Sequence, residues 1–212
     1  MIPQPGYFYF LDDSFFEDFP TNRIPKNKVP TPERSGQRPY YCVFADRDNS
    51  EIFWMIPISS KFAKYSQIAA TKSAKFGECN TIRFASILGS VRPILIQNMF
   101  SVTQKYIVDQ YLDKNAYVPV RISQKSHKDI HAKSMEVLRL HRRGIPAIFP
   151  DVDLIKKGLQ NQLEQEHQAA NQEHPPFPKK PSLDVILSNA QSRTAAKPPS
   201  PLQPISKETM II

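Results

Sequence analysis

Glycine is scarce in this sequence, and the glycine-rich motifs that hold phosphate groups are absent. The 212 residues contain six glycines, and neither GxGxxG nor GxxxxGK followed by Ser or Thr occurs. Both motifs depend on glycine because the backbone turns sharply and comes close to the phosphate. Dinucleotide-binding and P-loop sites are therefore excluded as the organising feature of the chain.

Cysteine is also scarce, since only Cys42 and Cys79 are present and no CxxC pair occurs. This excludes a disulfide framework and a cysteine zinc cage, and we expect two reduced thiols in the cytoplasm. His127 and His131 have a spacing that can bind zinc, but no Glu follows His127 and no third ligand is near in sequence. We therefore predict a solvated helix face at the two histidines, with no metal and no cofactor.

Long apolar runs are missing as well. The longest extends from Ile52 to Ile58, whereas a membrane-spanning helix needs about 20 apolar residues. The first residues lack a basic segment, and Asp12 and Asp13 interrupt their apolar stretch, so we predict no signal peptide. The sequence thus favours a cytoplasmic protein without a membrane partner.

Basic residues, in contrast, are abundant and concentrated in one part of the chain. The formal net charge is +8, and the segment from Asn161 onward contains five basic and five acidic residues, so the first 160 residues carry the whole excess. Between Ile58 and Lys125 there are ten basic and three acidic residues. Such a field favours a polyanionic partner, whereas the plainer interpretation is a soluble protein with a high pI.

Hydrophobic patterning predicts an α+β fold. We predict strands over residues 7–11, 40–45, 51–58, 80–88, 93–99 and 118–122, with the nearly all-apolar strand 51–58 in a central position. We predict helices over residues 12–19, 126–143 and 151–166, and a strand that passes into a helix over residues 101–112. Ser126 is the expected N-cap of the second helix, and Gly144 its expected end.

Proline marks the expected loop and domain boundaries. Five prolines fall between residues 20 and 39, which predicts a long extended loop, and eight fall between residues 175 and 204. A segment of the latter composition cannot bury enough apolar surface to fold alone. We therefore predict one domain over residues 1–166 and a disordered tail over residues 167–212.

The segment Ile56–Lys61, with the sequence IPISSK, is the most informative for chemistry. A buried strand that ends in two hydroxyls and a lysine places hydrogen-bond donors and a cation at the rigid edge of a sheet. Such an edge suits a phosphate, because hydroxyl and N–H groups donate to its oxygens and lysine neutralises its charge. The alternative is a polar turn that simply ends the strand.

The order of these segments resembles the ToxN/AbiQ-like endoribonuclease toxins of type III toxin–antitoxin systems. The matching features are Phe8-Tyr9 before an aromatic helix over residues 14–19, Arg38 before an apolar strand, Pro57-Ile58-Ser59-Ser60-Lys61, and Arg92-Pro93-Ile94 before Gln97-Asn98-Met99. The helix that begins at Ser126 corresponds to the C-terminal helix of the family. The resemblance extends over residues 7–145.

The resemblance implies a compact MazF/Kid-like antiparallel β-barrel or strongly curved sheet with packed helices. It further implies metal-independent RNA cleavage, in which a 2′-hydroxyl attacks the adjacent phosphate and leaves a 2′,3′-cyclic phosphate. The implied partners are a target RNA and an inhibitory antitoxin RNA made of repeated pseudoknots, with an RNA-bridged homo-oligomer as one form of assembly.

The resemblance also assigns the site residues. Ser59 and Ser60 would bind the scissile phosphate, Lys61 and Arg38 would supply positive charge, and Tyr9 would lie alongside. The family often has Pro-Lys-Lys after the hydroxyl pair, so whether Lys61 or Lys64 is catalytic stays open, and an arginine at position 38 supplies charge rather than a base. The expected RNA contacts are Lys28, Lys64, Arg83, Arg92, Gln97 and Asn98.

Two other functions fit the same sequence features. A non-catalytic RNA- or DNA-binding accessory protein of a mobile element would bind nucleic acid tightly and in a salt-dependent manner without cleaving it. A MazF-like nuclease inhibited by a protein would have an adjacent antitoxin reading frame in place of tandem RNA repeats.

Overall fold

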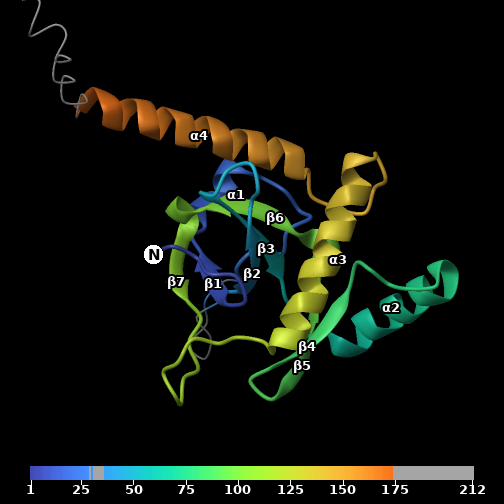
Figure 1. Cartoon of the computed structure of the whole chain (residues 1–212). Coiled ribbons are helices and arrows are strands. Elements are labelled where there is room, and N and C mark those ends of the chain that lie inside the picture. The colour runs from blue at the N-terminus through green and yellow to red at the C-terminus, as the bar shows by residue number, and fades with distance from the viewer. Residues whose placement is uncertain (29, 31–35, 174–212) are drawn as a thin grey trace, which may run out of the picture. The chain divides into compact units, whose positions relative to one another are not determined.

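The computed structural model describes residues 1–28, 30 and 36–173. The chain divides into two units, Met1–His167 and Gln168–Ile212, and the first contains every strand of the described residues and the site considered below. The tail predicted over residues 167–212 lies outside the described residues, apart from residues 167–173, which continue a helix. The described ranges combine α-helices with antiparallel strands, which confirms the predicted α+β class (Figure 1).

Short strands alternate with helices along the chain. In chain order the elements are β1 Phe8–Leu11, α1 Ser14–Asp18, β2 Pro39–Ala45, β3 Ile52–Pro57, α2 Phe62–Phe76, β4 Arg83–Ile87, β5 Ser90–Ile94, β6 Phe100–Thr103, β7 Ile107–Gln110, α3 Gln124–Arg142 and α4 Val152–Glu173. Two single 3-10 turns, Ile96–Asn98 and Gln104–Tyr106, precede β6 and β7.

Five strands form an antiparallel sheet in the order β6-β3-β2-β1-β7. Strand β3 lies between β2 and β6 and all its residues are buried, so its predicted central position and the β2–β3 hairpin are confirmed. The edge strands β6 and β7 pair with one neighbour each, so the sheet stays open within the described residues and a closed MazF/Kid-like barrel is not confirmed. Strands β4 and β5 form a separate hairpin, which a bridge between Ile58 and Ile94 joins to the end of β3.

Each face of the large sheet is covered by an apolar core. One core lies under α3 and includes Ile130 and Val137 of that helix. The other lies under α1 and α4 and includes Phe15 and Leu159 (Figure 1). Because both faces are covered, β3 has no polar face, and this explains its nearly continuous apolar sequence.

Helix α2 is the largest element that sequence patterning did not predict. It buries none of its side chains completely and rests on a small core through Tyr65, Ile68 and Ala69. Its apolar residues recur at helical spacing about as regularly as those of α4, but its lysines and polar residues give the segment the composition of a basic loop. In Figure 1, α2 lies beside the β4–β5 hairpin at the edge of the first unit.

Several predicted boundaries are wrong. The segment 101–112 does not pass into an α-helix, because a 3-10 turn buries Tyr106 and β7 then begins at Ile107. The strand predicted over residues 93–99 ends at Ile94, and the strand predicted over residues 118–122 makes only isolated bridges. The N-cap of α3 is Ser123 rather than Ser126, since the Ser123 Oγ accepts a hydrogen bond from the Ser126 N–H at 3.1 Å.

Candidate functional site

The turn Ser59–Lys61 is fixed in place at the end of β3. The Ser59 N–H donates to the Pro93 carbonyl at 3.0 Å, and the Pro57 carbonyl accepts from the Leu95 N–H at 3.0 Å. The Lys61 N–H donates to the Ser59 Oγ at 3.1 Å, and the chain then enters α2. The turn is therefore held on one side by β5 and on the other by the first turn of a helix.

Arg38 lies beside this turn although twenty residues separate the two in sequence. Its Nη1 donates to the Ile58 carbonyl at 3.1 Å, and its Nε donates to the Lys26 carbonyl at 3.3 Å. The structure thus places the Arg38 guanidinium on the residue that directly precedes the Ser59–Lys61 turn. The cause is the antiparallel pairing of β2 with β3. Tyr40 lies opposite Pro57, and the same register, continued past the ends of the strands, places residue 38 opposite residue 59.

Asn27 positions Arg38 and is a residue that sequence patterning missed. Its Oδ1 accepts from the Arg38 N–H at 2.9 Å, and its Nδ2 donates to the Leu11 carbonyl at 3.1 Å and to Asp13 at 3.0 Å. The Lys28 N–H also donates to the Gly36 carbonyl at 2.8 Å. These bonds hold Asn27 and Arg38 beside the end of β1. Nothing in the sequence marks this asparagine as a residue that positions Arg38.

The cations around the turn are available to an anion. Ser60, Lys61, Lys64 and Lys28 are exposed, and the lysines form no ion pair within the described ranges. The N–H groups at the start of α2 add partial positive charge, which favours an anion at this end of the helix. Hydroxyl, N–H, ammonium and guanidinium groups at one turn can bind a phosphate through charge-assisted hydrogen bonds.

The hydrogen bonds of the Tyr9 side chain are made away from the Ser59–Lys61 turn. The side chain is 1% exposed, and its hydroxyl accepts from the Gln4 N–H at 2.7 Å and from the Gln110 Nε2 at 3.4 Å. Burial raises the pKa of the Tyr9 hydroxyl above its ordinary value, so the hydroxyl keeps its proton at neutral pH. It borders a cavity of about 200 Å³ lined by residues near the N-terminus, and no hydrogen bond among the described residues joins it to the Ser59–Lys61 turn.

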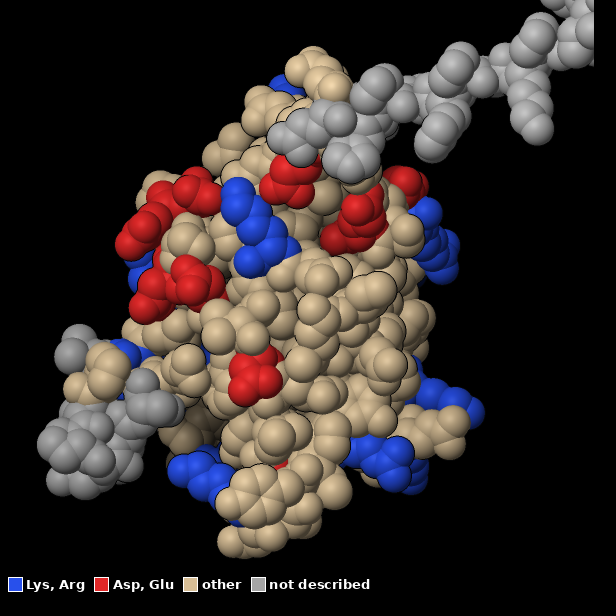
Figure 2. Space-filling view, turned by 90° about the vertical axis from the view of Figure 1, so that its left-hand side faces the viewer, with Lys and Arg blue, Asp and Glu red and all other residues tan. Residues whose placement is uncertain are grey.

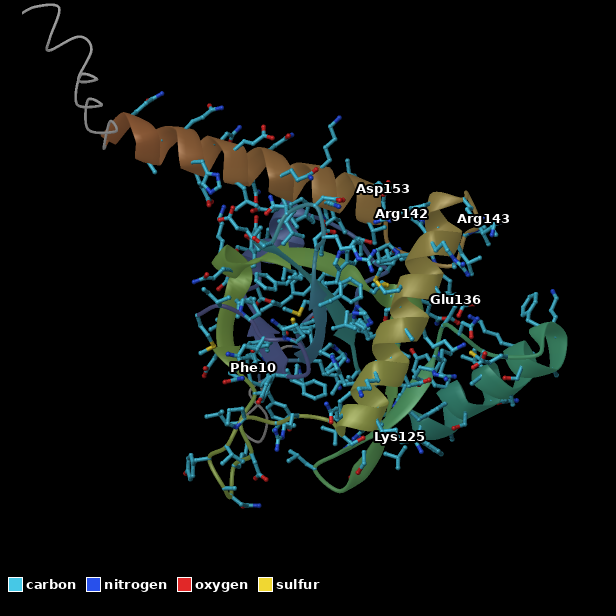
Figure 3. All side chains as sticks on the ribbon, in the orientation of Figure 1. Phe10, Lys125, Glu136, Arg142, Arg143 and Asp153 are labelled. Carbon is cyan, nitrogen blue, oxygen red and sulfur yellow. The ribbon has the colours of Figure 1, made fainter. Side chains whose placement is uncertain are left out.

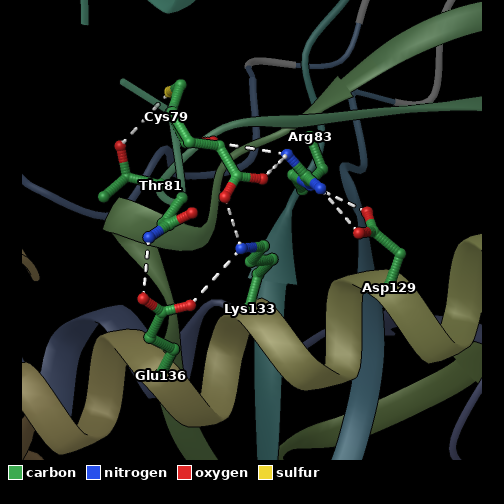
Figure 4. Close-up of polar contacts among 8 residues, drawn as sticks. Cys79, Thr81, Arg83, Asp129, Lys133 and Glu136 are labelled. Carbon is green, nitrogen blue, oxygen red and sulfur yellow. Dashed lines mark hydrogen bonds and ion pairs between the residues drawn. The ribbon is translucent and has the colours of Figure 1, made fainter. Parts of the chain in front are cut away.

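Arg83 belongs to an ion network between β4 and α3, which Figure 4 shows. Its guanidinium binds both Asp129 oxygens, at 2.6 and 2.7 Å, and contacts Glu78 at 3.3 Å. The hydrogen bond from Arg83 lowers the pKa of the Asp129 carboxyl. Lys133 extends the network to Glu78 at 2.7 Å. Arg83 could bind a phosphate only after breaking these contacts, so its role is to hold β4 on α3.

Gln97 and Asn98 also have structural partners. The Gln97 side chain is 5% exposed, and its Oε1 accepts from the Lys72 Nζ at 2.7 Å. The Asn98 Nδ2 donates to the Arg23 carbonyl at 2.6 Å. Arg92 is half-buried on β5, next to the Pro93 carbonyl that binds the turn. Of the six expected RNA contacts, Lys28, Lys64 and Arg92 are the ones whose side chains have no hydrogen-bond partner in the described part of the chain.

The prediction of a solvated face at His127 and His131 is wrong. The Tyr41 hydroxyl and the His127 Nδ1 are 2.5 Å apart, and the His131 ring lies 5.2 Å from the ring of Phe44. The cause is α3, which crosses β2 and places the two histidines on aromatic side chains of that strand. Burial, with a smaller effect of His131, lowers the pKa of His127. Neither a cluster of metal-ligating side chains nor a helix able to cross a membrane occurs in the described ranges.

Comparisons with known proteins bear on the fold. No protein-family model and no curated protein matches the sequence. The structure is similar to that of AbiQ, a lactococcal anti-phage endoribonuclease of the type III toxin–antitoxin system, with a TM-score of 0.50 and 14% sequence identity. The match covers 74% of this chain and 98% of AbiQ. At this identity the similarity is one of fold, and the chain has an AbiQ-like arrangement of helices and strands.

Proposed function

We propose that this protein is an endoribonuclease toxin of a type III toxin–antitoxin system. The observation that carries the proposal is the hydrogen bond from the Arg38 Nη1 to the Ile58 carbonyl, which places a guanidinium beside the Ser59–Lys61 turn. The AbiQ-like fold supports it, because AbiQ, a solved protein of similar fold, is an endoribonuclease. In this proposal the exposed turn binds the scissile phosphate of a flexible RNA strand.

The proposed reaction is an internal transfer of the phosphate. The 2′-oxygen forms a bond to phosphorus while the bond to the 5′-oxygen breaks, which leaves a 2′,3′-cyclic phosphate and a 5′-hydroxyl. The proton of the 2′-hydroxyl passes to solvent water at the exposed turn, and Lys61 or Lys64 gives a proton to the departing 5′-oxygen. The Ser60 hydroxyl binds a non-bridging oxygen, and Arg38 stabilises the added negative charge of the transition state.

Ser59 and Tyr9 have supporting roles in this assignment. The Ser59 hydroxyl accepts from the Lys61 N–H, so it shapes the turn and orients the lysine. The Tyr9 hydroxyl bonds to Gln4 and Gln110, so we assign it no step of the reaction. The proposed partners are target RNA and an inhibitory antitoxin RNA that covers the same turn, in the cytoplasm.

The test is cleavage of cellular RNA by purified protein in EDTA, followed by end-group analysis. We expect discrete cuts with 2′,3′-cyclic phosphate ends, and we expect Ser60→Ala and Lys61→Ala to lower the rate by about 100-fold or more. The matched controls are Ser50→Ala, in the exposed turn at the other end of β3, and Lys157→Ala, an exposed lysine of α4. Cleavage that survives in both site variants, or that fails equally in the controls, would contradict the site.

A second candidate function is RNA binding without cleavage. The observation that favours it is the exposed basic surface around the turn, which needs no catalytic group to bind RNA. The test uses folded protein that is free of nucleic acid. If this protein binds RNA with an affinity that falls steeply as the salt concentration rises, and leaves the RNA intact, RNA binding is selected over the nuclease.

A further inference from the structure

Helix α2 differs from its surroundings in carrying positive charge without any acid. No Asp or Glu occurs between Glu51 and Glu78, whereas the helix contains Lys64, Lys72 and Lys75. Glu78, the first acid after the helix, is engaged by Lys133 at 2.7 Å and by Arg83 at 3.3 Å. The helix lysines therefore have an uncompensated charge that begins directly at the Ser59–Lys61 turn.

The exposed side of α2 consists of a row of polar side chains flanked by alanines. Lys64, Gln67, Thr71 and Lys75 follow one another at helical spacing along it, and all four are exposed. The exposed residues around them are Ala63, Ala70 and Ala74. We call these seven residues the outer face of α2. Its small side chains allow a partner to come close to the helix, and its two lysines select a partner of negative charge.

Lys72 points the other way and anchors the helix. Its Nζ donates to the Thr81 Oγ1 and to the Gln97 Oε1, both at 2.7 Å. Burial lowers the pKa of this lysine, and both partners are neutral side chains that accept its hydrogen bonds. Lys72 thus fixes α2 on the β4 side, which leaves Lys64 and Lys75 as the charges that face outward.

Exposed aromatic rings stand at both ends of the helix. Phe62 is 47% exposed and lies edge-on to Phe84, and Phe76 is 69% exposed with the Lys75 Nζ 5.2 Å from its ring centre. An exposed ring beside a lysine suits an unpaired base, which stacks on the ring while its phosphate meets the cation. A duplex offers no free base face, so this combination favours a single strand.

Other charged surfaces of the first unit have a different character. Arg142 and Arg143 lie at the C-terminal end of α3, where they complement the negative end of the helix dipole (Figure 3). The face over β7 in Figure 2 mixes acidic and basic side chains in its upper part and carries basic ones around its lower edge. The acid-free outer face of α2 is therefore the better match to a polyanion.

We infer that the outer face of α2 binds the segment of single-stranded RNA adjacent to the scissile phosphate. The inference rests on the proposed function, because the Ser59–Lys61 turn fixes where the strand begins. Lys64 and Lys75 are separated by about 17 Å along the helix axis, the length of about five phosphates in a stacked strand. The helix thus holds the substrate on one side of the turn, and Phe62 and Phe76 stack on its bases.

The experiment measures the affinity of the full chain for a 2′-O-methylated single-stranded RNA, which lacks the attacking hydroxyl, over a range of salt concentrations. Each phosphate contact on a single strand contributes a slope of about −0.7 in the logarithm of affinity against the logarithm of salt. We expect Lys75→Gln to reduce the slope by about 0.7, and Lys64→Gln with Lys75→Gln to reduce it by about 1.4. We expect Phe76→Leu to lower the affinity about fivefold or more with the slope unchanged.

Lys157→Gln is the matched control, because it removes one exposed lysine from α4. Equal slopes for Lys75→Gln and Lys157→Gln would overturn the inference, and so would duplex DNA that binds as tightly and loses as much affinity in the double variant. Because none of the substituted residues is fully buried, the variants should keep the wild-type thermal unfolding.

The binding experiment separates failure of the inference from failure of the proposed function. If the wild type cleaves RNA while the double variant binds the methylated strand with unchanged slope, the inference fails and the nuclease stands. If the wild type cleaves no RNA but its binding depends on Lys75 and Phe76, the nuclease fails and the binding role of α2 is supported.

Discussion

Asp46 shows how a single buried charge holds distant parts of the first unit together. It is 7% exposed, and its oxygens accept from the Trp54 Nε1 at 2.8 Å, the Lys156 Nζ at 2.9 Å and the Asp48 N–H at 3.0 Å. Burial by itself would raise the pKa of this carboxyl, but the hydrogen bonds outweigh burial and lower it. The β2–β3 turn is thereby tied to α4.

Replacement of Asp46 by Asn should lower the free energy of unfolding by about 1–3 kcal/mol at pH 7, because Lys156 loses the buried one of its two charged partners. The folded-state pKa of Asp46 lies below its unfolded value, so its stabilisation is complete above the ordinary aspartate value of 3.8 and is lost as the pH falls below it. The difference between wild type and Asp46→Asn should therefore shrink in acid, as denaturant unfolding at pH 7 and pH 3 would measure.

Asp48→Asn provides the comparison, since Asp48 pairs with the same lysine but its side chain is 69% exposed. Solvent screens that pair, so the loss should stay below about 1 kcal/mol. A cost for Asp48→Asn equal to that of Asp46→Asn would mean that burial of the charge does not decide its contribution.

At the residue scale, the sequence pattern accounts for some positions around the candidate site and not for others. Arg38 lies beside the residue that precedes the Ser59–Lys61 turn because strand pairing, which the hydrophobic pattern predicts, carries it there. Arg83 and Gln97 are among the RNA contacts expected from the resemblance, but their hydrogen bonds go to Asp129 and Lys72. Sequence order does not reveal which polar side chain will meet a partner from a distant element.

At the scale of single elements, α3 illustrates that the residue at which a helix begins depends on the segment that precedes it. Ser123 and Ser126 are both able to cap a helix, and the sequence pattern favours a cap at Ser126. In the structure the Ser123 residue has extended backbone angles and accepts the Ser126 N–H, while Ser126 already lies inside the helix. The fixed position of residues 120–122 against the sheet selects between the two, since Val120 and Ile122 are buried.

Ser123→Ala should therefore lower the free energy of unfolding by about 1 kcal/mol, because the N–H of Ser126 loses its acceptor. Ser126→Ala should cost clearly less, since alanine is a good helix residue and only the hydroxyl contact with Ser123 at 2.9 Å is lost. Paired denaturant unfolding of the two variants gives the comparison, and a larger loss for Ser126→Ala would restore the cap to position 126.

Helix α2 shows that regular spacing alone does not identify an element. Its apolar residues recur at helical spacing about as regularly as those of α4, but four of its residues are alanines and none of its side chains is fully buried. Its main polar anchor is Lys72, which reaches Thr81 and Gln97. The lysines therefore make the segment resemble a basic loop in the sequence. The shallow burial of the helix leaves Lys64 and Lys75 exposed beside the candidate site.

At the scale of the whole molecule, the described fold is completed by the first part of α4. Ile155, Leu159 and Leu163 join the core under α1, and Leu163 is the last core residue in the described part of the chain. Gly158 allows α4 to pack closely on Phe19, since a Cβ at position 158 would lie 2.6 Å from the Phe19 ring. The apolar core of Met1–His167 is thus formed by residues up to Leu163.

Removal of residues 174–212 should leave the free energy of unfolding of the first unit within about 0.5 kcal/mol of the full chain, because Leu163 is the last core residue among those described. Leu163→Ala in the full chain should cost about 2–5 kcal/mol, as expected for truncation of a buried leucine. Thermal and denaturant unfolding of both proteins would test this, and a truncated protein that loses as much as Leu163→Ala would show that the removed residues stabilise the fold.

The sequence by itself determined the α+β class, the central β2–β3 hairpin, the two C-terminal helices and the concentration of positive charge in the first 160 residues. These follow from local pattern and composition, which a chain carries before it folds. Tertiary structure alone decided that the sheet stays open within the described residues, that His127 meets Tyr41, that Arg83 is held by Asp129, and that α2 is a helix with Lys64 and Lys75 outward. The physical reason is that each depends on which distant surface an element packs against, and the packing of a whole fold selects that surface.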